Sequence, residues 1–229
     1  MTKKSALRER LEAAVLERHC AHHPMTDKWV AGKLGTAALA GWAIEHYHWI
    51  SNILGALLQI AANAPLGAQR SLLEGYLEET DPARPHLDIV LKFAKANGAD
   101  PAEIRRGRGL PTTEAWAAWL NRVARQESFI AAIAAINIGT ESQSPLLYGR
   151  VLPALREIYR FKEDDIEHFW LHVEADTEHG NHAFEFLDRH ATTPGLQDLA
   201  VHWARESARM RWFYFDGIYL HYEMGYTLR

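Results

Sequence analysis

The chain has 229 residues, of which 48% are hydrophobic and 24% charged, as is usual for a globular domain. Its 25 basic and 29 acidic side chains give a formal net charge of −4, which excludes an electrostatic case for binding nucleic acid or an anionic membrane surface. The single cysteine, Cys20, excludes an intramolecular disulfide and any cysteine-rich zinc or iron–sulfur site.

The start of the chain is polar. Its first residues, Met-Thr-Lys-Lys-Ser, contain no apolar signal core, and nowhere do about 18 apolar residues follow one another. We therefore expect a cytoplasmic protein without a membrane span.

The first half of the chain has apolar residues at helical spacing. Thr36 suits the N-cap of a long helix that should end before Pro65. The run from Trp42 to Ile50 is too apolar and aromatic for a solvated face, so this helix is predicted to be central. The predicted helices of this half cover about residues 4–19, 37–63, 66–79 and 86–96.

The second half is also predicted to be helical, with a short helical turn after Asp100-Pro101. The run from Phe129 to Ile138 is almost wholly apolar and should be buried. No segment alternates with a period of two. The predicted helices of this half cover about residues 112–138, 146–160, 163–190 and 195–224. We predict a single all-α domain over residues 1–229, a bundle of about seven helices.

One stripe of the helix predicted over 163–190 carries metal-ligating side chains. At about 100° per residue, His172, Asp176 and His179 lie at roughly 0°, 40° and −20° around the helix axis. Imidazole nitrogen and carboxylate oxygen together suit iron, manganese or zinc. The alternative is a solvated polar face, so this stripe alone is half of a metal site.

Two other segments supply further candidate ligands. Glu79 and His86 flank a proline-containing break between two apolar helices, although Glu78 leaves the first assignment open by one position. Glu141 directly follows the most apolar run of the chain, where a buried carboxylate is costly unless it is paired or bound to metal. The alternative for Glu141 is a loop carboxylate in water.

The order and spacing of these residues resemble a known family. A glutamate and a histidine seven residues apart, a glutamate 55 residues further on and a His-x3-Asp-x2-His segment are similar to the haem-oxygenase-like diiron oxidases and oxygenases. That family shares its helical fold with the TenA-type thiaminases and with PqqC, the pyrroloquinoline-quinone synthase. The resemblance implies a non-haem site for two iron ions, with manganese or a mixed pair as an open alternative. The implied ligands are Glu79, His86, Glu141, His172, Asp176 and His179.

The chain also departs from some members of that family. The TenA-type cysteine nucleophile would lie in the helix that here reads Ala131-Ala132-Ile133, so thiaminase chemistry is not expected. PqqC works without a metal, whereas the full ligand set here favours one. CADD-like members look most similar, and some of them consume their own tyrosine and lysine to make p-aminobenzoate. The matching positions here are Thr26, Thr140 and Val151, so we expect a separate substrate.

The resemblance implies an O2-dependent oxidoreductase that acts on a small amine, amino acid or fatty acid. Tyr47 and Glu141 are the candidate catalytic residues, and Trp49 is expected in the wall of the substrate pocket. Arg209 or Arg211 is a candidate to bind a substrate carboxylate by paired hydrogen bonds. The alternatives are core packing for Tyr47 and a surface position for each arginine.

Two other functions stay open at this point: a cofactorless oxidase of the PqqC type, and a non-catalytic helical protein that binds a metal or another ligand. The expected partners are O2 and a small-molecule substrate, with neither nucleic acid nor membrane. A homodimer is a further expectation, because bundles of this sort commonly dimerise through helix faces.

Overall fold

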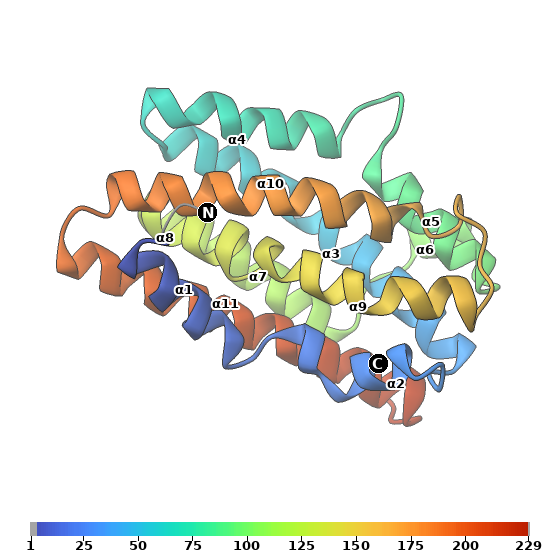
Figure 1. Cartoon of the computed structure of the whole chain (residues 1–229). Helices are drawn as coiled ribbons and strands as arrows, with labels where there is room; N and C mark the ends of the chain where they lie inside the picture. The colour runs from blue at the N-terminus through green and yellow to red at the C-terminus, as the bar shows by residue number, and fades with distance from the viewer. Residues whose placement is uncertain (1–3, 229) are drawn as a thin grey trace.

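The computed structural model describes residues 4–228, apart from the side chains of residues 71 and 174–179. Within these residues every regular element is helical, which confirms the all-α class (Figure 1). The first six α-helices are α1 (Ala6–Leu16), α2 (Pro24–Val30), α3 (Thr36–Asn63), α4 (Leu66–Glu79), α5 (His86–Ala96) and α6 (Pro101–Arg106). The others are α7 (Pro111–Gln126), α8 (Phe129–Ile133), α9 (Ser144–Glu157), α10 (Glu167–His190) and α11 (Pro194–Ile218).

The described residues thus form eleven α-helices, more than the seven predicted. Short helices such as α2 and α6 account for part of the difference, because a few turns offer little apolar periodicity. The predicted helix over 112–138 is also divided. Glu127 is extended, and the Ser128 side chain accepts a hydrogen bond from the Ala131 backbone N–H, which starts α8 as a new helix.

Four short turns complete the helical structure. They are η1 (Cys20–His22) and η3 (Glu141–Gln143), both 3₁₀-helical, and η2 (Ala134–Ile138) and η4 (Tyr219–Glu223), both π-helical. In η2 the Gly139 N–H donates to the Ala134 carbonyl, five residues back. A π turn holds one residue more than an α-helical turn and is frequent at functional sites.

Helix α3 occupies the centre of the bundle, as its sequence predicted. It packs against α4, α5 and α7, and its Trp42 ring contacts Trp29, Phe93 and Phe169. Its N-cap is Gly35 rather than the predicted Thr36, and no side chain caps this end. A 28-residue helix that is apolar over most of its surface is stabilised by burial, so a side-chain cap is dispensable.

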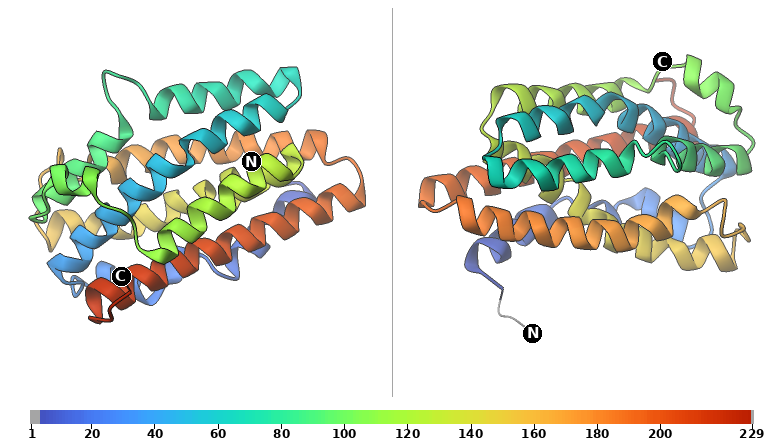
Figure 2. Two further views of the ribbon diagram at one scale, coloured as in Figure 1. Left: turned by 180° about the vertical axis from the view of Figure 1, so that it is seen from behind. Right: turned by 90° about the horizontal axis from the view of Figure 1, so that it is seen from above.

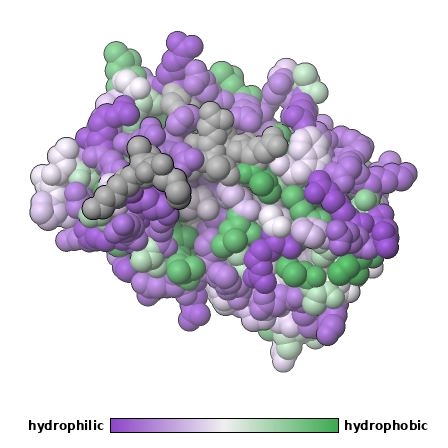
Figure 3. Space-filling view, viewed as in Figure 1, coloured by the Kyte–Doolittle hydropathy of each residue, from purple (hydrophilic) through white to green (hydrophobic). Residues whose placement is uncertain are grey.

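The helices lie roughly along one direction, with α10 between α4 and the α1–α11 side of the bundle (Figures 1 and 2). Helix α4 packs mainly on α3 and leaves Leu66 and Leu77 exposed. On the face shown in Figure 3, apolar residues are dispersed among hydrophilic ones. Among the described helices, none combines the length and apolarity needed to cross a bilayer.

Candidate metal centre

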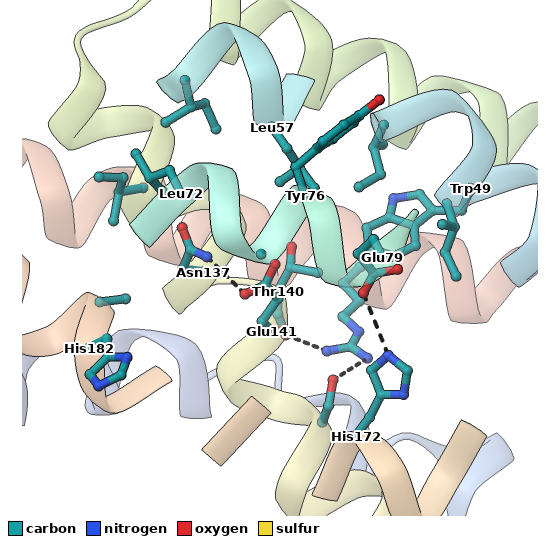
Figure 4. A pocket seen from close by; sticks show the side chains of 18 of the residues that line it. Trp49, Leu57, Leu72, Tyr76, Glu79, Asn137, Thr140, Glu141, His172 and His182 are labelled. Atoms are coloured by element: carbon teal, nitrogen blue, oxygen red, sulfur yellow. Dashed lines mark hydrogen bonds and ion pairs between the residues drawn. The ribbon is translucent and has the colours of Figure 1, made fainter. Parts of the chain in front are cut away.

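Three candidate ligands meet where α4, α5 and α10 come together. Glu79 is the last residue of α4, His86 is the first residue of α5, and His172 lies in α10. One ligand atom from each lies within 4.8 Å of the others. Glu79 Oε1 is 2.9 Å from His86 Nδ1. It is 3.8 Å from His172 Nε2 (Figure 4). The structure therefore places Glu79, rather than Glu78, beside the two imidazoles.

The break between α4 and α5 brings Glu79 and His86 together. The Thr80 hydroxyl donates to the Tyr76 carbonyl, and the Asp81 carboxylate accepts from the Ala83 N–H. Pro85 then occupies the N-cap of α5, where its missing N–H costs nothing. This loop brings Glu79 and His86, seven residues apart in sequence, close together.

His172 is held in a defined tautomer. Its Nδ1 lies 2.7 Å from the His168 carbonyl oxygen, which can only accept, so Nδ1 carries the proton. Nε2 then faces Glu79 Oε1 at 3.8 Å. An imidazole fixed by a backbone carbonyl on one nitrogen is the usual arrangement of a metal-binding histidine.

Two features show that these residues fit a cation. Burial raises the pKa of Glu79, but His172 and His86 outweigh this effect and hold that pKa below its usual value, so the carboxylate is ionised. Its Oε2 is buried and has no hydrogen-bond partner among the described residues. Because a buried unsatisfied oxygen costs about 1–3 kcal/mol, a cation at this point would remove the penalty. The oxygen and nitrogen donors suit iron.

Glu141 lies further along the same cavity wall. It begins η3, directly after the π turn, and its Oε2 accepts a hydrogen bond of 2.8 Å from Asn137 Nδ2 (Figure 4). Gly139 between them allows close approach to α11, since a Cβ there would lie 2.7 Å from the Ala204 carbonyl oxygen. The side chains of Asp176 and His179, also predicted as ligands, lie outside the described residues.

A cavity of about 150 Å³ extends from this group of ligands between α3, α4, η2 and α10. One end is polar, and the other is mainly apolar. Polar side chains at the first end include His46, Glu79, Glu141, Tyr148, His172 and Arg211. The second end is lined mostly by Ile53, Leu57, Ile60, Ala68, Leu72 and Phe186, with the polar Asn137 and His182 on the same side as Leu72 (Figure 4). The arrangement suits a small organic molecule beside a metal site.

The other predicted site residues divide into two groups. Trp49 and Arg211 line the cavity. Arg211 is buried and donates to the Thr140 carbonyl, whereas the Arg209 side chain is 53% exposed and pairs with Glu206. Tyr47 lines a separate, more open hollow with His48 and Arg105. Neighbouring residues on a helix point about 100° apart, so His46 faces the cavity and Tyr47 does not.

Sequence reasoning missed His46 and Tyr148 as cavity residues. The Tyr148 hydroxyl lies 3.3 Å from His168 Nε2, and the His168 ring lies 4.1 Å from that of His172. Burial lowers the pKa of both His46 and His168 well below the usual value, so these rings are neutral. The aromatic run around His46 indicated that this residue is buried. Tyr148 is a single tyrosine in a helix, and nothing in its sequence context indicated that it lines the cavity. His182 also lines the cavity.

Comparisons with known proteins agree with the fold. The family described as "iron-containing redox enzyme" matches residues 40–212, most of the chain. The chain therefore belongs to this family, which confirms the haem-oxygenase-like relationship predicted from the ligand pattern.

Particular relatives and solved structures support this assignment. The chain is 25% identical to 4-aminobenzoate synthase of Nitrosomonas europaea, over 95% of this chain and 93% of that protein. It is 24% identical to a pyrroloquinoline-quinone synthase of Granulibacter bethesdensis, over 93% and 84% of the two chains. A TenA homologue from Pseudomonas syringae has the same fold, with a TM-score of 0.82 at 15% identity over 94% and 93% of the chains.

Proposed function

We propose that this protein is an O2-dependent oxidoreductase that uses a dinuclear non-haem iron site to oxidise a small organic substrate. The observation that carries the proposal is the ionised, partly unsatisfied Glu79 between His86 and His172 at the polar end of a largely apolar cavity. Membership of the iron-containing redox enzymes supports iron as the metal.

The predicted ligand set would hold two iron ions, with manganese or a mixed pair as the alternative metals. Its members are Glu79, His86, Glu141, His172, Asp176 and His179. Bound iron would supply the electrons that activate O2. The protein contributes ligand orientation through the His168 carbonyl and a largely apolar cavity beside the ligands. Tyr148, hydrogen-bonded to His168, is placed to hold a proton beside the site.

A separate substrate, rather than the protein's own side chains, fits the cavity best. Thr26 is buried, and its hydroxyl donates to the Cys20 carbonyl. The Thr140 hydroxyl is also buried and is bonded to the Ala135 carbonyl and the Ser207 hydroxyl. Two hydroxyls already engaged in the fold are poor candidates for self-modification. The substrate classes under test are amines, amino acids and fatty acids.

The direct test is anaerobic titration of metal-free protein with Fe(II), followed by O2 consumption with a panel of those substrates. We expect about two iron ions per chain and O2 uptake that depends on both iron and substrate. Uptake by metal-free protein would instead support the cofactorless oxidase. Iron binding without O2 uptake by any substrate would support a non-catalytic metal-binding protein.

A further inference from the structure

A second hollow, called the α3–α7 hollow below, opens between α3, α7 and the loop that joins α6 to α7. Its volume of about 710 Å³ accommodates a small molecule. The space stays unfilled because several of the residues that line it are small, among them Ser51, Ala117 and Ala118. No residue lines both this hollow and the cavity beside Glu79. It is therefore a separate space, which the proposed oxidation does not use.

Positive charge is concentrated in the α3–α7 hollow. Arg105, Arg108 and Arg125 line it, and among the described side chains Glu114 is the only carboxylate that does so. The lining thus has a formal excess of two positive charges, although the chain as a whole has a net charge of −4. A concave surface with charge of one sign raises the local concentration of ligands of the opposite sign. The hollow therefore favours an anionic ligand.

The carboxylates beside these arginines do not hold them tightly. Arg105 pairs with Asp88 at 2.7 Å, and Arg108 pairs with Glu114 at 3.5 Å. All four side chains are at least 44% exposed, and ion pairs exposed to this degree contribute at most about 1 kcal/mol. Arg125 is also exposed and forms no ion pair with a described carboxylate. A multiply charged anion can therefore replace the existing pairs, because it offers each guanidinium a stronger acceptor.

The loop that carries Arg108 is fixed on both sides. The Gly107 N–H donates to the last turn of α6, and the Leu110 N–H donates to Glu45 Oε2 at 2.7 Å. Between them, the N–H groups of Arg108 and Gly109 donate to no acceptor among the described residues. Successive backbone N–H groups in a turn are a common binding site for phosphate, as are arginine side chains. Both kinds of donor meet at this end of the hollow.

Tyr47 adds an aromatic ring to the wall beside these donors. It is half-buried, and its ring meets the His48 ring edge-on, with 5.5 Å between the centroids. A nucleic-acid base that stacks on such a ring gains about 1–3 kcal/mol. The hollow thus combines donors for phosphate with an aromatic ring for a flat group.

We propose that the α3–α7 hollow binds a nucleotide. The phosphate groups lie against Arg105, Arg108 and the N–H groups of their loop, and the base stacks on Tyr47. Arg125 lies eleven residues beyond Glu114 on α7, roughly 16 Å along the helix axis, so it attracts the ligand without contacting these phosphates. The inference is independent of iron and O2, because none of these residues lines the cavity beside Glu79.

The test is calorimetric titration of metal-free protein with ATP, inorganic triphosphate and adenosine, in the presence of EDTA. ATP should bind at least about tenfold more tightly than either of the others, because only ATP offers both the phosphates and the base. Its affinity should fall as the salt concentration rises, since the arginines are exposed to solvent.

Three substitutions locate the site. Arg108→Gln should weaken binding of both ATP and triphosphate about tenfold, because a charge-assisted pair is lost. Tyr47→Leu should weaken ATP binding and leave triphosphate binding unchanged. Arg106→Gln is the matched control and should behave like the wild type, because Arg106 is exposed on the same segment but does not line the hollow.

Three results would overturn the proposal. Absence of ATP binding at millimolar concentration would show that no nucleotide site exists. Equal affinities of the wild type for ATP and triphosphate would show that the base does not stack. Equal losses of ATP affinity in Arg106→Gln and Arg108→Gln would show non-specific attraction to surface charge. Because every titration uses metal-free protein, a failure of O2 chemistry would refute the proposed function without affecting this result.

Discussion

Two carboxylates of the bundle, one buried and one half-buried, differ in the groups that contact them. Glu45 on α3 is fully buried and accepts hydrogen bonds from the Leu110 N–H and the Thr113 and Tyr222 hydroxyls. Glu79 faces two imidazoles, and its second oxygen has no hydrogen-bond partner among the described residues. Three neutral donors, two at the start of α7 and one in η4, stabilise the fold around Glu45. The two imidazoles and the Oε2 atom without a hydrogen-bond partner among the described residues instead suit the cation site that we propose at Glu79.

Removing the charge of Glu79 should have the largest effect on metal binding. Glu79→Gln should weaken Fe(II) binding by about 100-fold or more, because a ligand oxygen and its charge are both lost. Metal content after dialysis and anaerobic Fe(II) titration measure the effect. Glu78→Gln is the matched control on the exposed adjacent position and should bind iron normally. Normal iron binding by Glu79→Gln would refute the assigned ligand.

Glu45→Ala should lower the stability of the fold and leave iron binding unchanged. Three donors lose their acceptor, so the free energy of unfolding should fall by about 3 kcal/mol. Urea denaturation of metal-free protein measures the change. Iron binding per folded chain should remain at the wild-type level, because Glu45 does not line the cavity. If a stably folded Glu45→Ala variant lost iron binding, Glu45 would not have the purely structural role that distinguishes it from Glu79.

His19 is a buried imidazole that, like Glu45, accepts a hydrogen bond from the fold. Its Nδ1 accepts from the Ala21 N–H at 3.1 Å. Burial, assisted by Arg211, lowers its pKa from 6.5 to about 3. Between these values the unfolded chain binds more protons than the folded one, so stability falls as the pH falls below about 6.5. At pH 5 the loss from His19 should be about 2 kcal/mol.

The check is His19→Asn, which keeps an N-cap acceptor but does not titrate in this range. Urea denaturation at pH 7 and pH 5 should show a smaller difference for this variant than for the wild type. An identical difference in the two proteins would assign the acid sensitivity to other groups.

The smallest expected effect concerns the Tyr222 hydroxyl, one of the donors to Glu45. Tyr222→Phe removes a hydrogen bond of 2.8 Å and should lower the free energy of unfolding by about 1 kcal/mol. The ring still packs over Gly41, where a Cβ would meet the Tyr222 ring. Thermal denaturation measures the change, and a loss as large as that of Glu45→Ala would mean that the other two donors contribute little.

The long helices were predictable because the side that is buried gives the sequence a clear helical spacing of apolar residues. The helix predicted over 37–63 is observed as α3 (Thr36–Asn63), and the histidine stripe lies on α10 as expected. The Glu79–His86 pairing also followed from sequence, because the proline break left two polar residues between apolar helices. The interruption at Ser128 and the π turn were not predicted, since neither changes the pattern of apolar residues.

The sequence could not decide which arginine enters the cavity. Arg209 and Arg211 alternate with Met210 and Trp212, so apolar neighbours occur on both sides of the helix. Two residues differ by about 200° around the axis, and only the packing of α11 fixes which one is buried. The same limit applied to Tyr47 beside His46. A family pattern can indicate ligands. When a helix has apolar residues on all sides, however, only its packing against other helices decides which side faces the cavity.

The π turn at Ala134–Ile138 makes the position of Glu141 depend on residue count as well as on residue type. Deleting Ala135 would convert the turn to a regular α-helix and rotate everything after it by about 100° relative to α8. Glu141 would then leave the cavity even though every candidate ligand was still present in the chain. Gain or loss of one residue here would therefore move Glu141 relative to the cavity, without any substitution among the residues of the site.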